Sequence, residues 1–453
     1  MTREELLLSL RSALQRPDAA SFPAVVEHNH PADVAATLDE LEHEPAQICS
    51  LLRSLATEPR AELFGHLPPP LQVEVAVCMD RSELAELFLH MSPDDRADVF
   101  NRLPEDQREA FLPALAQVER EDIRRLAAYE EGTVGATMTS DYATVPPYLS
   151  AREAVEHLRS VAPDRETIYQ AFVIDDERRI VGTVSLKDLI VAPPYARVSD
   201  FMERDVITIG AESPREEAAR LISKYDLIAL PVVDTAERLI GIVTYDDAMD
   251  VAEAEATEDF HRVGGLGELA VGIRDATIAA LYRKRIFWLV VLVFGNLLSG
   301  AGIAYFEDTI ATYVALVFFL PLLIGSGGNA GAQAATLMVR ALATGEVVLK
   351  DWAAMLGREL VVAGLLGATM SLAVVWLGLW RGGAEIALVV AMTMQLVVVA
   401  GSVIGMSLPF ILSRFQFDPA TASAPLITTI ADATGVVLYL GIATAVLGLP
   451  AQG

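Results

Sequence analysis

Cysteine and histidine are scarce in this chain, and their positions exclude several kinds of site. The 453 residues include two cysteines, Cys49 and Cys78, which lack the spacing of metal ligands. No disulfide framework or zinc site is therefore expected. All seven histidines precede residue 286. The sequence has no phosphate-cradling glycine loop, nucleophile elbow or Cys/His pair, so it does not predict an enzyme.

Positive charge is also scarce. The formal net charge is −27, which argues against nucleic acid as a partner because nucleic acid attracts basic surfaces. Only eight of the 61 acidic and five of the 34 basic residues follow Arg285. The sequence therefore predicts an acidic soluble part and a nearly uncharged C-terminal part. The N-terminus, MTREELLLSLRSALQR, lacks the apolar core of a signal peptide, so we expect the soluble part to stay in the cytoplasm.

Long apolar runs dominate the part after Arg285. A helix needs about 20 apolar residues to cross a bilayer. Five stretches qualify, and they cover about 286–306, 311–341, 353–379, 385–413 and 419–449. The second contains Pro321 and GSGGNAGAQ (325–333), which predicts a break, because irregular backbone at membrane depth must face protein or water.

Basic residues near the ends of these stretches predict their orientation. With five crossings, seven bases fall on the side of the soluble part: Arg283, Lys284, Arg285, Arg340, Lys350, Arg358 and Arg414. Only Arg381 falls on the other side. The positive-inside rule then predicts a multi-pass protein of the cell (plasma or inner) membrane, with a cytoplasmic N-terminus and a C-terminus outside.

One full charge, Asp432, lies in the middle of the last stretch, in ITTIADATGVVLYL. A carboxylate at this depth is costly unless something compensates it. No Lys, Arg or His lies deep in any stretch, so water, protonation or a bound cation remain as the compensation. On a helix, its face would carry Thr421, Pro425, Thr428 and Gly435. Oxygen ligands favour Mg²⁺, Ca²⁺ or Mn²⁺, and the residues do not choose among these ions.

Residues 138–256 contain an internal repeat. MTSDYATVPPYLSAREAVEHLRS (138–160) parallels MERDVITIGAESPREEAARLIS (202–223), and 172–192 parallels 231–252. Each copy predicts a helix followed by two strands. Each ends in Gly, two apolar residues, Ser or Thr, two further residues and Asp: Gly182, Ser185 and Asp188, then Gly241, Thr244 and Asp247. This resembles a tandem pair of cystathionine-β-synthase-type (CBS) domains, which either bind adenine nucleotides through this motif or serve as a structural pseudo-dimer.

Residues 1–130 repeat a short amphipathic unit punctuated by proline, as in AELFGHLP (61–68) and ADVFNRLP (97–104). This pattern predicts short helices stacked as hairpins in a small superhelix. Acids crowd two segments: Asp94, Asp95 and Asp98, and then Asp246, Asp247, Asp250, Glu253, Glu255, Glu258 and Asp259. The second segment is either a solvated charged helix or a surface that divalent cations bridge to another acidic surface.

The order of these parts resembles the MgtE family of magnesium channels over essentially the whole chain. The most specific segments are LAAYEEGTVGATMT (126–139), EAEATEDF (253–260), PLLIGSGGNAGAQAATL (321–337) and DPATASAPLITTIADATG (418–435). The resemblance implies a multidomain membrane protein with four parts. They are an all-α N-terminal superhelical domain (1–130), α/β tandem CBS domains (131–252, copies about 137–192 and 201–252), a linking or plug helix (253–285) and an α-helical transmembrane pore domain with five spans (286–453).

The resemblance also implies a homodimer in the lipid bilayer with its pore on the two-fold axis. The implied pore residues for Mg²⁺ are Asp432, Thr428, Asn329, Gln333, Thr336, Gly435 and Asp418. The acids that would bind cytoplasmic Mg²⁺ and close the pore are Asp94, Asp95, Asp226, Asp247, Asp250, Glu255, Glu258 and Asp259. ATP would bind the CBS pair near Tyr169, Ala171, Ser185, Lys187 and Asp188.

Two other functions remain open at this point. A secondary transporter that couples divalent cations to another ion would also have a broken, glycine-rich span. A membrane-anchored nucleotide or cation sensor would conduct nothing, and its function would not depend on Asp432.

Overall fold

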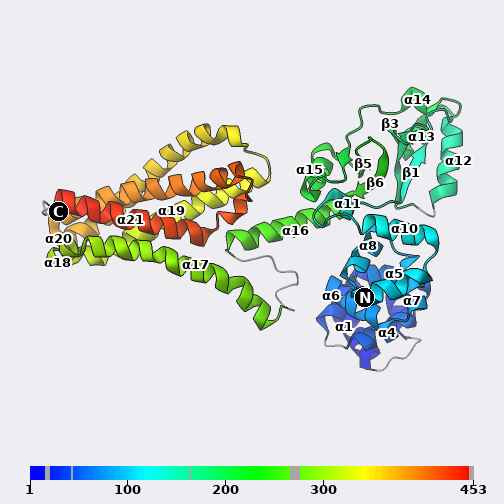
Figure 1. Cartoon of the computed structure of the whole chain (residues 1–453), viewed down its shortest axis with the longest axis horizontal. Helices are drawn as coiled ribbons and strands as arrows, with labels where there is room; N and C mark the ends of the chain where they lie inside the picture. Colours follow the sequence, from blue (N-terminus) through cyan, green and yellow to red (C-terminus); the bar gives the residue numbers. More distant parts are fainter. Residues whose placement is uncertain (16–20, 42–43, 163–164, 266–275, 448–453) are drawn as a thin grey trace. The chain divides into compact units, whose positions relative to one another are not determined.

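The computed structural model describes residues 1–15, 21–41, 44–162, 165–265 and 276–447. The chain divides into two compact units, residues 1–253 and 254–453. Figure 1 labels the helices and strands of both, and each unit is described here by itself.

The first part of unit 1 is helical. Its helices are α1 (Arg3–Gln15), α2 (Ser21–Glu27), α3 (Pro31–Glu40), α4 (Pro45–Arg53), α5 (Thr57–Gly65), α6 (Pro69–Cys78), α7 (Arg81–Phe88), α8 (Pro93–Arg102), α9 (Glu105–Phe111), η1 (Leu112–Ala114) and α10 (Gln117–Leu126). Proline begins α3, α4, α6 and α8, where its missing N–H costs nothing. From α3 to α9, each helix packs on the second helix after it, around one apolar core. The predicted stack of short helices is present.

The rest of unit 1 holds two copies of one α/β motif. The first contains α11 (Val134–Thr137), β1 (Tyr142–Val145), α12 (Ala151–Val161), β2 (Thr167–Ile174), β3 (Ile180–Ser185) and α13 (Leu186–Val191). The second contains α14 (Val198–Phe201), β4 (Ile209–Gly210), α15 (Arg215–Tyr225), β5 (Ala229–Val233), β6 (Leu239–Thr244) and the start of α16 (Tyr245–Val263). Each sheet has its first strand parallel to the second and the third antiparallel. The sequence analysis missed β1 and β4, which are only four and two residues long.

The two copies interlock through matching contacts. Gly182 lies against Met202, and Gly241 lies against Met138: a Cβ on either glycine would come within 2.7 Å and 2.5 Å of the methionine sulfur, respectively. A larger residue would push the strand away from the methionine, so the glycine of the repeated motif is a packing requirement. Phe172 of β2 is buried with Leu239 of β6 between the sheets. The predicted repeat is therefore a pseudo-symmetric pair.

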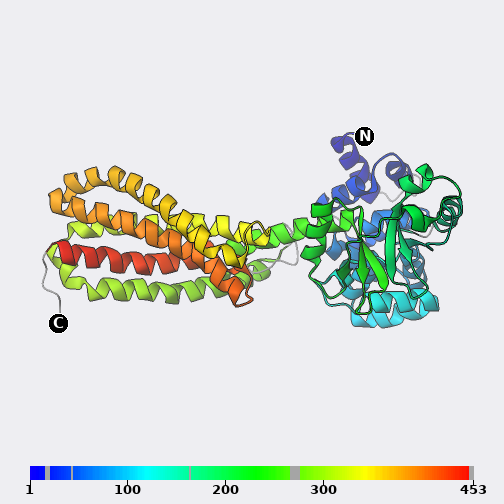
Figure 2. The same cartoon turned by 90° about the horizontal axis from the view of Figure 1, so that it is seen from above.

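Unit 2 is a bundle of long apolar helices (Figure 2). Its elements are the end of α16, α17 (Ile278–Tyr305), α18 (Glu307–Thr312), α19 (Ala315–Ala343), η3 (Leu349–Asp351), α20 (Trp352–Arg414), η4 (Pro419–Thr421) and α21 (Ala424–Val446). Among the described residues, four helices are long and apolar enough to cross a membrane: α17, α19, α20 with η3, and α21. The sequence predicted five stretches, and two of them, 353–379 and 385–413, fall within α20. The middle of the predicted linking helix, 266–275, lies outside the described residues.

Helix α20 folds back on itself. Gly383 interrupts it with φ 79° and ψ −173°, a backbone conformation that only glycine adopts readily. The two halves then pack together: Ser371 Oγ donates to Ala391 O at 2.8 Å, and Gln395 Nε2 donates to Gly364 O at 3.1 Å. Figures 1 and 2 both show this turn.

Helix α19 is continuous, although the sequence predicted a break at Pro321 and the glycine run. The glycines instead allow α19 and α20 to touch at the backbone. A Cβ on Gly331 would lie 2.7 Å from Gly401 O, and Cβ atoms on Gly401 and Gly405 would overlap the carbonyl oxygens of Gly327 and Gly331. Small residues at matching positions permit this close packing of helices in lipid. The prediction of a break was wrong, because the same composition also suits an interface.

Candidate cation sites

Asp432 lies in the third turn of α21, inside the apolar unit. Its side chain is half-buried, and no hydrogen bond or ion pair to it occurs within the part of the chain that the structure describes. One turn earlier, the Thr428 hydroxyl donates to Pro425 O at 2.9 Å, and its oxygen keeps acceptor capacity toward a cation. The described residues therefore do not balance the charge of Asp432, and water, protonation or a bound cation remain as the compensation.

Gly328 of α19 forms the wall beside Asp432. A Cβ at this position would lie 3.2 Å from Thr428 Cγ2 and 3.4 Å from Asp432 Oδ1. The absent side chain lets the α19 backbone approach the carboxylate. The sequence analysis named the neighbour Asn329 and overlooked Gly328, although both lie in the quoted glycine run.

The polar residues of α19 form an exposed stripe rather than a ring around Asp432. Asn329, Gln333 and Thr336 are all exposed, at helical spacing on one side of the helix. Thr336 donates to its own helix at Ala332 O, 2.9 Å away, and none of the three hydrogen-bonds to Asp432. Gly435 is buried at a helix contact, beside Val397 and Ile324. A polar stripe next to an unpaired carboxylate indicates a wet surface within the membrane unit.

Asp418 is not beside Asp432. It lies before η4, where Asp418 Oδ1 accepts a hydrogen bond from Ala420 N at 2.8 Å. Its other carboxylate oxygen forms an ion pair with Arg262. This predicted pore residue therefore pairs with a guanidinium group, at the start of the segment that leads into α21.

A second group of acids lies within unit 1, where α8 meets the start of α16. Asp94 and Asp95 come from α8, and Asp247 and Asp250 come from α16. Asp94 Oδ1 is buried without a hydrogen-bond partner. Burial raises the pKa of Asp94 well above its usual range, and the Asp247 and Asp95 carboxylates raise it further. The structure brings together four of the eight acids that the resemblance implied for regulation.

Glu166 belongs to the same group and was missed by the sequence analysis. Burial and the carboxylates of Asp94, Asp246, Asp95 and Asp141 raise the pKa of Glu166 to about 7. Burial is also the largest cause of the raised pKa of Asp247, about 7, with Asp246 and Glu166 adding to it and Thr244 opposing it. Nothing in the sequence near Glu166 marks this role, because its partners lie on other elements.

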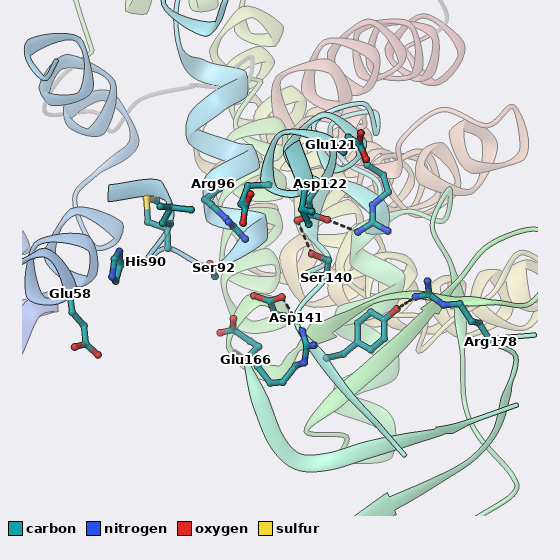
Figure 3. A pocket seen from close by; sticks show the side chains of 17 residues that line it. Glu58, His90, Ser92, Arg96, Glu121, Asp122, Ser140, Asp141, Glu166 and Arg178 are labelled. Atoms are coloured by element: carbon teal, nitrogen blue, oxygen red, sulfur yellow. Dashed lines mark hydrogen bonds and ion pairs between the residues drawn. The ribbon is translucent and has the colours of Figure 1, made fainter. Parts of the chain in front are cut away.

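A cavity of about 1100 Å³ opens beside this group, between the helical part and the first α/β copy. Figure 3 shows Asp141 and Glu166 together on one wall and Arg96, from α8, on the facing wall. Ion pairs neutralise part of the lining: Arg125 with Asp122 at 2.6 Å, and Arg165 with Asp141 at 3.4 Å. The Glu166 carboxyl thus has open space next to it for hydrated ions.

The remaining predicted regulatory acids lie apart from this group. Asp226 is exposed at the C-terminal end of α15, in the left-handed conformation (φ 52°). Glu255, Glu258 and Asp259 are on the part of α16 that belongs to unit 2, where burial raises the pKa of Asp259. Among the described residues, no three His, Cys, Asp or Glu side chains are arranged to hold one bare metal ion. These acids fit hydrated ions, which Mg²⁺ prefers because it gives up water reluctantly.

The raised pKa values predict how the stability depends on pH when no metal is present. Between about pH 4 and 7, folded Asp247 and Glu166 bind protons that the unfolded chain has released. Stability is therefore greatest below about pH 4 for these groups and falls as the pH rises through 7. Thermal melting of the full chain in chelator should show a falling Tm, roughly 2–4 °C for each kcal/mol.

The matched test of this pH effect uses Asp247→Asn. This variant should flatten the fall in Tm, and added Mg²⁺ should do the same in the unsubstituted protein. A Tm that rises from pH 5 to 8 in chelator, or an unchanged slope in Asp247→Asn, would contradict the raised pKa values of Asp247 and Glu166.

The predicted nucleotide residues lie at one end of the first sheet. Ser185 begins α13, and its hydroxyl accepts from Asp188 N at 3.0 Å. Gln170 pairs with Ser185 across β2 and β3, which brings Tyr169 and Ala171 to this edge. Tyr169 is 66% exposed, Ala171 is buried, and Lys187 and Asp188 are exposed. In the second copy, the matching Asp247 belongs to the acidic group instead.

Family models match each part of the chain. The model described as "Divalent cation transporter" matches residues 320–442. The model for the MgtE intracellular N domain matches 29–132, and the CBS domain model matches 133–195 and 198–254.

Two curated relatives match over nearly their whole length. The magnesium transporter MgtE of Thermus thermophilus is 38% identical over 448 residues, covering 98% of this chain and 99% of that protein. The magnesium transporter MgtE of Bacillus subtilis is 33% identical, covering 98% of both. Among solved structures, the cytosolic domain of the Mg²⁺ channel MgtE in complex with ATP is similar, with TM-score 0.51 and 37% identity. It covers 54% of this chain and 99% of its own. The chain therefore belongs to the MgtE family of magnesium transporters.

Proposed function

We propose that the protein is a homodimeric, Mg²⁺-selective channel in the cell membrane, closed by cytoplasmic Mg²⁺. The observation that carries this proposal is Asp432, a half-buried carboxylate in an apolar unit without a partner among the described residues. A permeating hydrated cation supplies the missing charge. Recording single-channel currents of purified protein in a planar bilayer, at low and high Mg²⁺ on the cytoplasmic side, tests both parts of the proposal.

Five crossings of the membrane are part of this proposal, and the fold of unit 2 supports them. The 63 residues of α20 would extend about 95 Å as one helix, roughly three times the hydrocarbon thickness. The turn at Gly383 divides it into two crossings, which raises the four apolar helices to five spans. An odd number places the C-terminus outside if the N-terminus is cytoplasmic, in line with the distribution of basic residues.

A second copy of the chain completes the pore in this proposal. In one chain, Asn329, Gln333 and Thr336 are exposed, and a polar stripe facing lipid is costly. Two copies related by a two-fold axis would turn these stripes toward each other. The pore would then hold two Asp432 carboxylates, whose combined charge suits a divalent cation.

The acids of unit 1 supply the regulation. Repulsion among Asp94, Asp95, Asp247 and Asp250 opposes their close packing when Mg²⁺ is scarce. Cations that bind only the closed arrangement stabilise it by mass action, so closure grows with cytoplasmic Mg²⁺. Helix α16 carries both Asp247 and, in unit 2, Glu255, Glu258 and Asp259. In this proposal, α16 therefore transmits the binding of cations by the acids of unit 1 to the membrane unit.

ATP binding at the first α/β copy is a separate part of the proposal. The 37%-identical relative was solved with ATP, and Ser185 and Asp188 lie here at a helix start that suits a phosphate or ribose hydroxyl. Calorimetric titration of the full chain with ATP should show saturable binding that Asp188→Asn weakens at least about tenfold, with Asp176→Asn as the control. Equal binding by Asp188→Asn would remove this site from the account.

Two rival functions make different predictions. A broken second span was compatible with a secondary transporter, and α19 is continuous instead. A transporter would also give no unitary currents in the bilayer recording. A sensor that conducts nothing would keep its function after Asp432→Asn.

A further inference from the structure

The last turn of α16 is attached to the segment that leads into α21. The guanidinium of Arg262 forms ion pairs with two carboxylates: Glu258, one turn earlier on the same helix, and Asp418, which precedes η4. The three side chains are 39%, 15% and 32% exposed, respectively. One arginine thus joins two acids that the resemblance had implied as metal ligands.

Apolar contacts continue this attachment beyond the ion pairs. Val263 packs against a buried cluster that includes Ala420, Ala422 and Ile427, from η4 and α21. Gly265 follows in the left-handed conformation (φ 72°), where a Cβ would meet Pro425 at 3.4 Å. The chain therefore leaves α16 at a tight turn on top of the first residues of α21.

We propose that Arg262 is a positioning residue for gating, a built-in cation that couples the end of α16 to the helix that carries Asp432. Without it, the Glu258 and Asp418 carboxylates would lose the positive charge that they share. Asp418 is also tied to Ala420 N, so a pull on Asp418 moves η4 and the start of α21. Asp432 lies only about two turns into that helix, roughly 12 Å from its start.

Surface ion pairs are usually worth little stability, so a role in folding alone would leave function almost unchanged when Arg262 is replaced. A role in coupling has a different signature. It should change how strongly cytoplasmic Mg²⁺ inhibits the flux, while the flux at low Mg²⁺ stays near that of the unsubstituted protein. This inference rests on the proposed gating function.

The test measures Mg²⁺ uptake into vesicles that contain the full-length protein, across a range of Mg²⁺ on the cytoplasmic side. Arg262→Gln should raise the half-inhibiting Mg²⁺ concentration at least about tenfold, with the flux at low Mg²⁺ within about twofold. Asp418→Asn should also raise the half-inhibiting concentration, and the double variant should raise it no further than either single one, because both remove one interaction. Exchanging the charges, Arg262→Asp with Asp418→Arg, should restore inhibition. Arg358→Gln removes the same charge from an exposed site of unit 2 and should change nothing.

A second measurement does not depend on conduction. With Cys49 and Cys78 replaced by serine, Arg262→Cys together with Asp418→Cys should form a disulfide under mild oxidation in the folded dimer. No cross-link, normal inhibition in Arg262→Gln, or additive effects in the double variant would overturn the role of Arg262. If the unsubstituted protein itself is not inhibited by Mg²⁺, the proposed gating function fails, whatever the cross-link shows.

Discussion

Replacing Asp432 by asparagine is expected to reduce Mg²⁺ flux at least about a hundredfold. The substitution keeps the size of the side chain and removes the charge that offsets a cation's loss of water. Removing one member of a poorly solvated charge pair costs about 3–5 kcal/mol, and about 1.4 kcal/mol corresponds to a factor of ten. The measurement is uptake of Mg²⁺ into proteoliposomes at low cytoplasmic Mg²⁺, where the proposed gating leaves the pore open.

Two control variants separate the charge of Asp432 from its place in the fold. Asp432→Glu keeps the charge and should retain more flux than Asp432→Asn. Glu385→Gln removes an equal charge from an exposed position near the turn of α20 and should leave the flux near normal. Normal flux in a well-folded Asp432→Asn would contradict the pore assignment and favour the non-conducting sensor. Repeating the assay with Ca²⁺ and Mn²⁺ would rank the cations, which the residues alone do not.

Replacing Asp94 and Asp247 together by asparagine is expected to raise the half-inhibiting Mg²⁺ concentration at least about tenfold. A cation shared by two carboxylates attracts both, whereas asparagine only removes their repulsion. The closed arrangement therefore loses more stabilisation than it gains. A ligand at a hundred times its Kd contributes about 2.7 kcal/mol to the state that it binds, so the loss is measurable. The readout is Mg²⁺ uptake as a function of cytoplasmic Mg²⁺.

The matched control for these two acids is Asp176→Asn, an exposed acid in the first α/β copy. It should leave the inhibition curve in place. An unchanged half-inhibiting concentration in the double variant would remove these acids from the sensor. A double variant that is closed even without Mg²⁺ would also contradict this prediction, because the relief of repulsion would then outweigh the loss of the bridging cation.

Local patterns in the sequence predicted the elements well. The repeated motif around Gly182 and Gly241 predicted paired domains, because each copy needs a glycine that packs against the methionine of the other half. Proline and apolar spacing predicted the short helices of the N-terminal part. The apolar stretches predicted the long helices, and α20 contains two of these stretches because one glycine at positive φ turns the chain.

Contacts between elements that lie far apart in the chain could not be predicted from the sequence. The run from Gly325 to Gln333 predicted a broken helix, and only its partner glycines on α20 reveal that it is a packing surface. Asp418 carries the same charge as Asp432 in the same family segment, yet Arg262 engages one and nothing in the described chain engages the other. Glu166 joined the acidic group because four acids from other elements surround it. The sequence shows the charge and composition of each segment, whereas the partner of each charged side chain depends on the fold.

The most direct test of the central claim is single-channel recording of the full-length protein in a planar bilayer. The account predicts unitary Mg²⁺ currents when cytoplasmic Mg²⁺ is low, with an open probability that falls steeply as cytoplasmic Mg²⁺ rises. In Asp432→Asn those currents should be absent. An equal open probability at low and high cytoplasmic Mg²⁺, or uptake of Mg²⁺ without any unitary current, would contradict it.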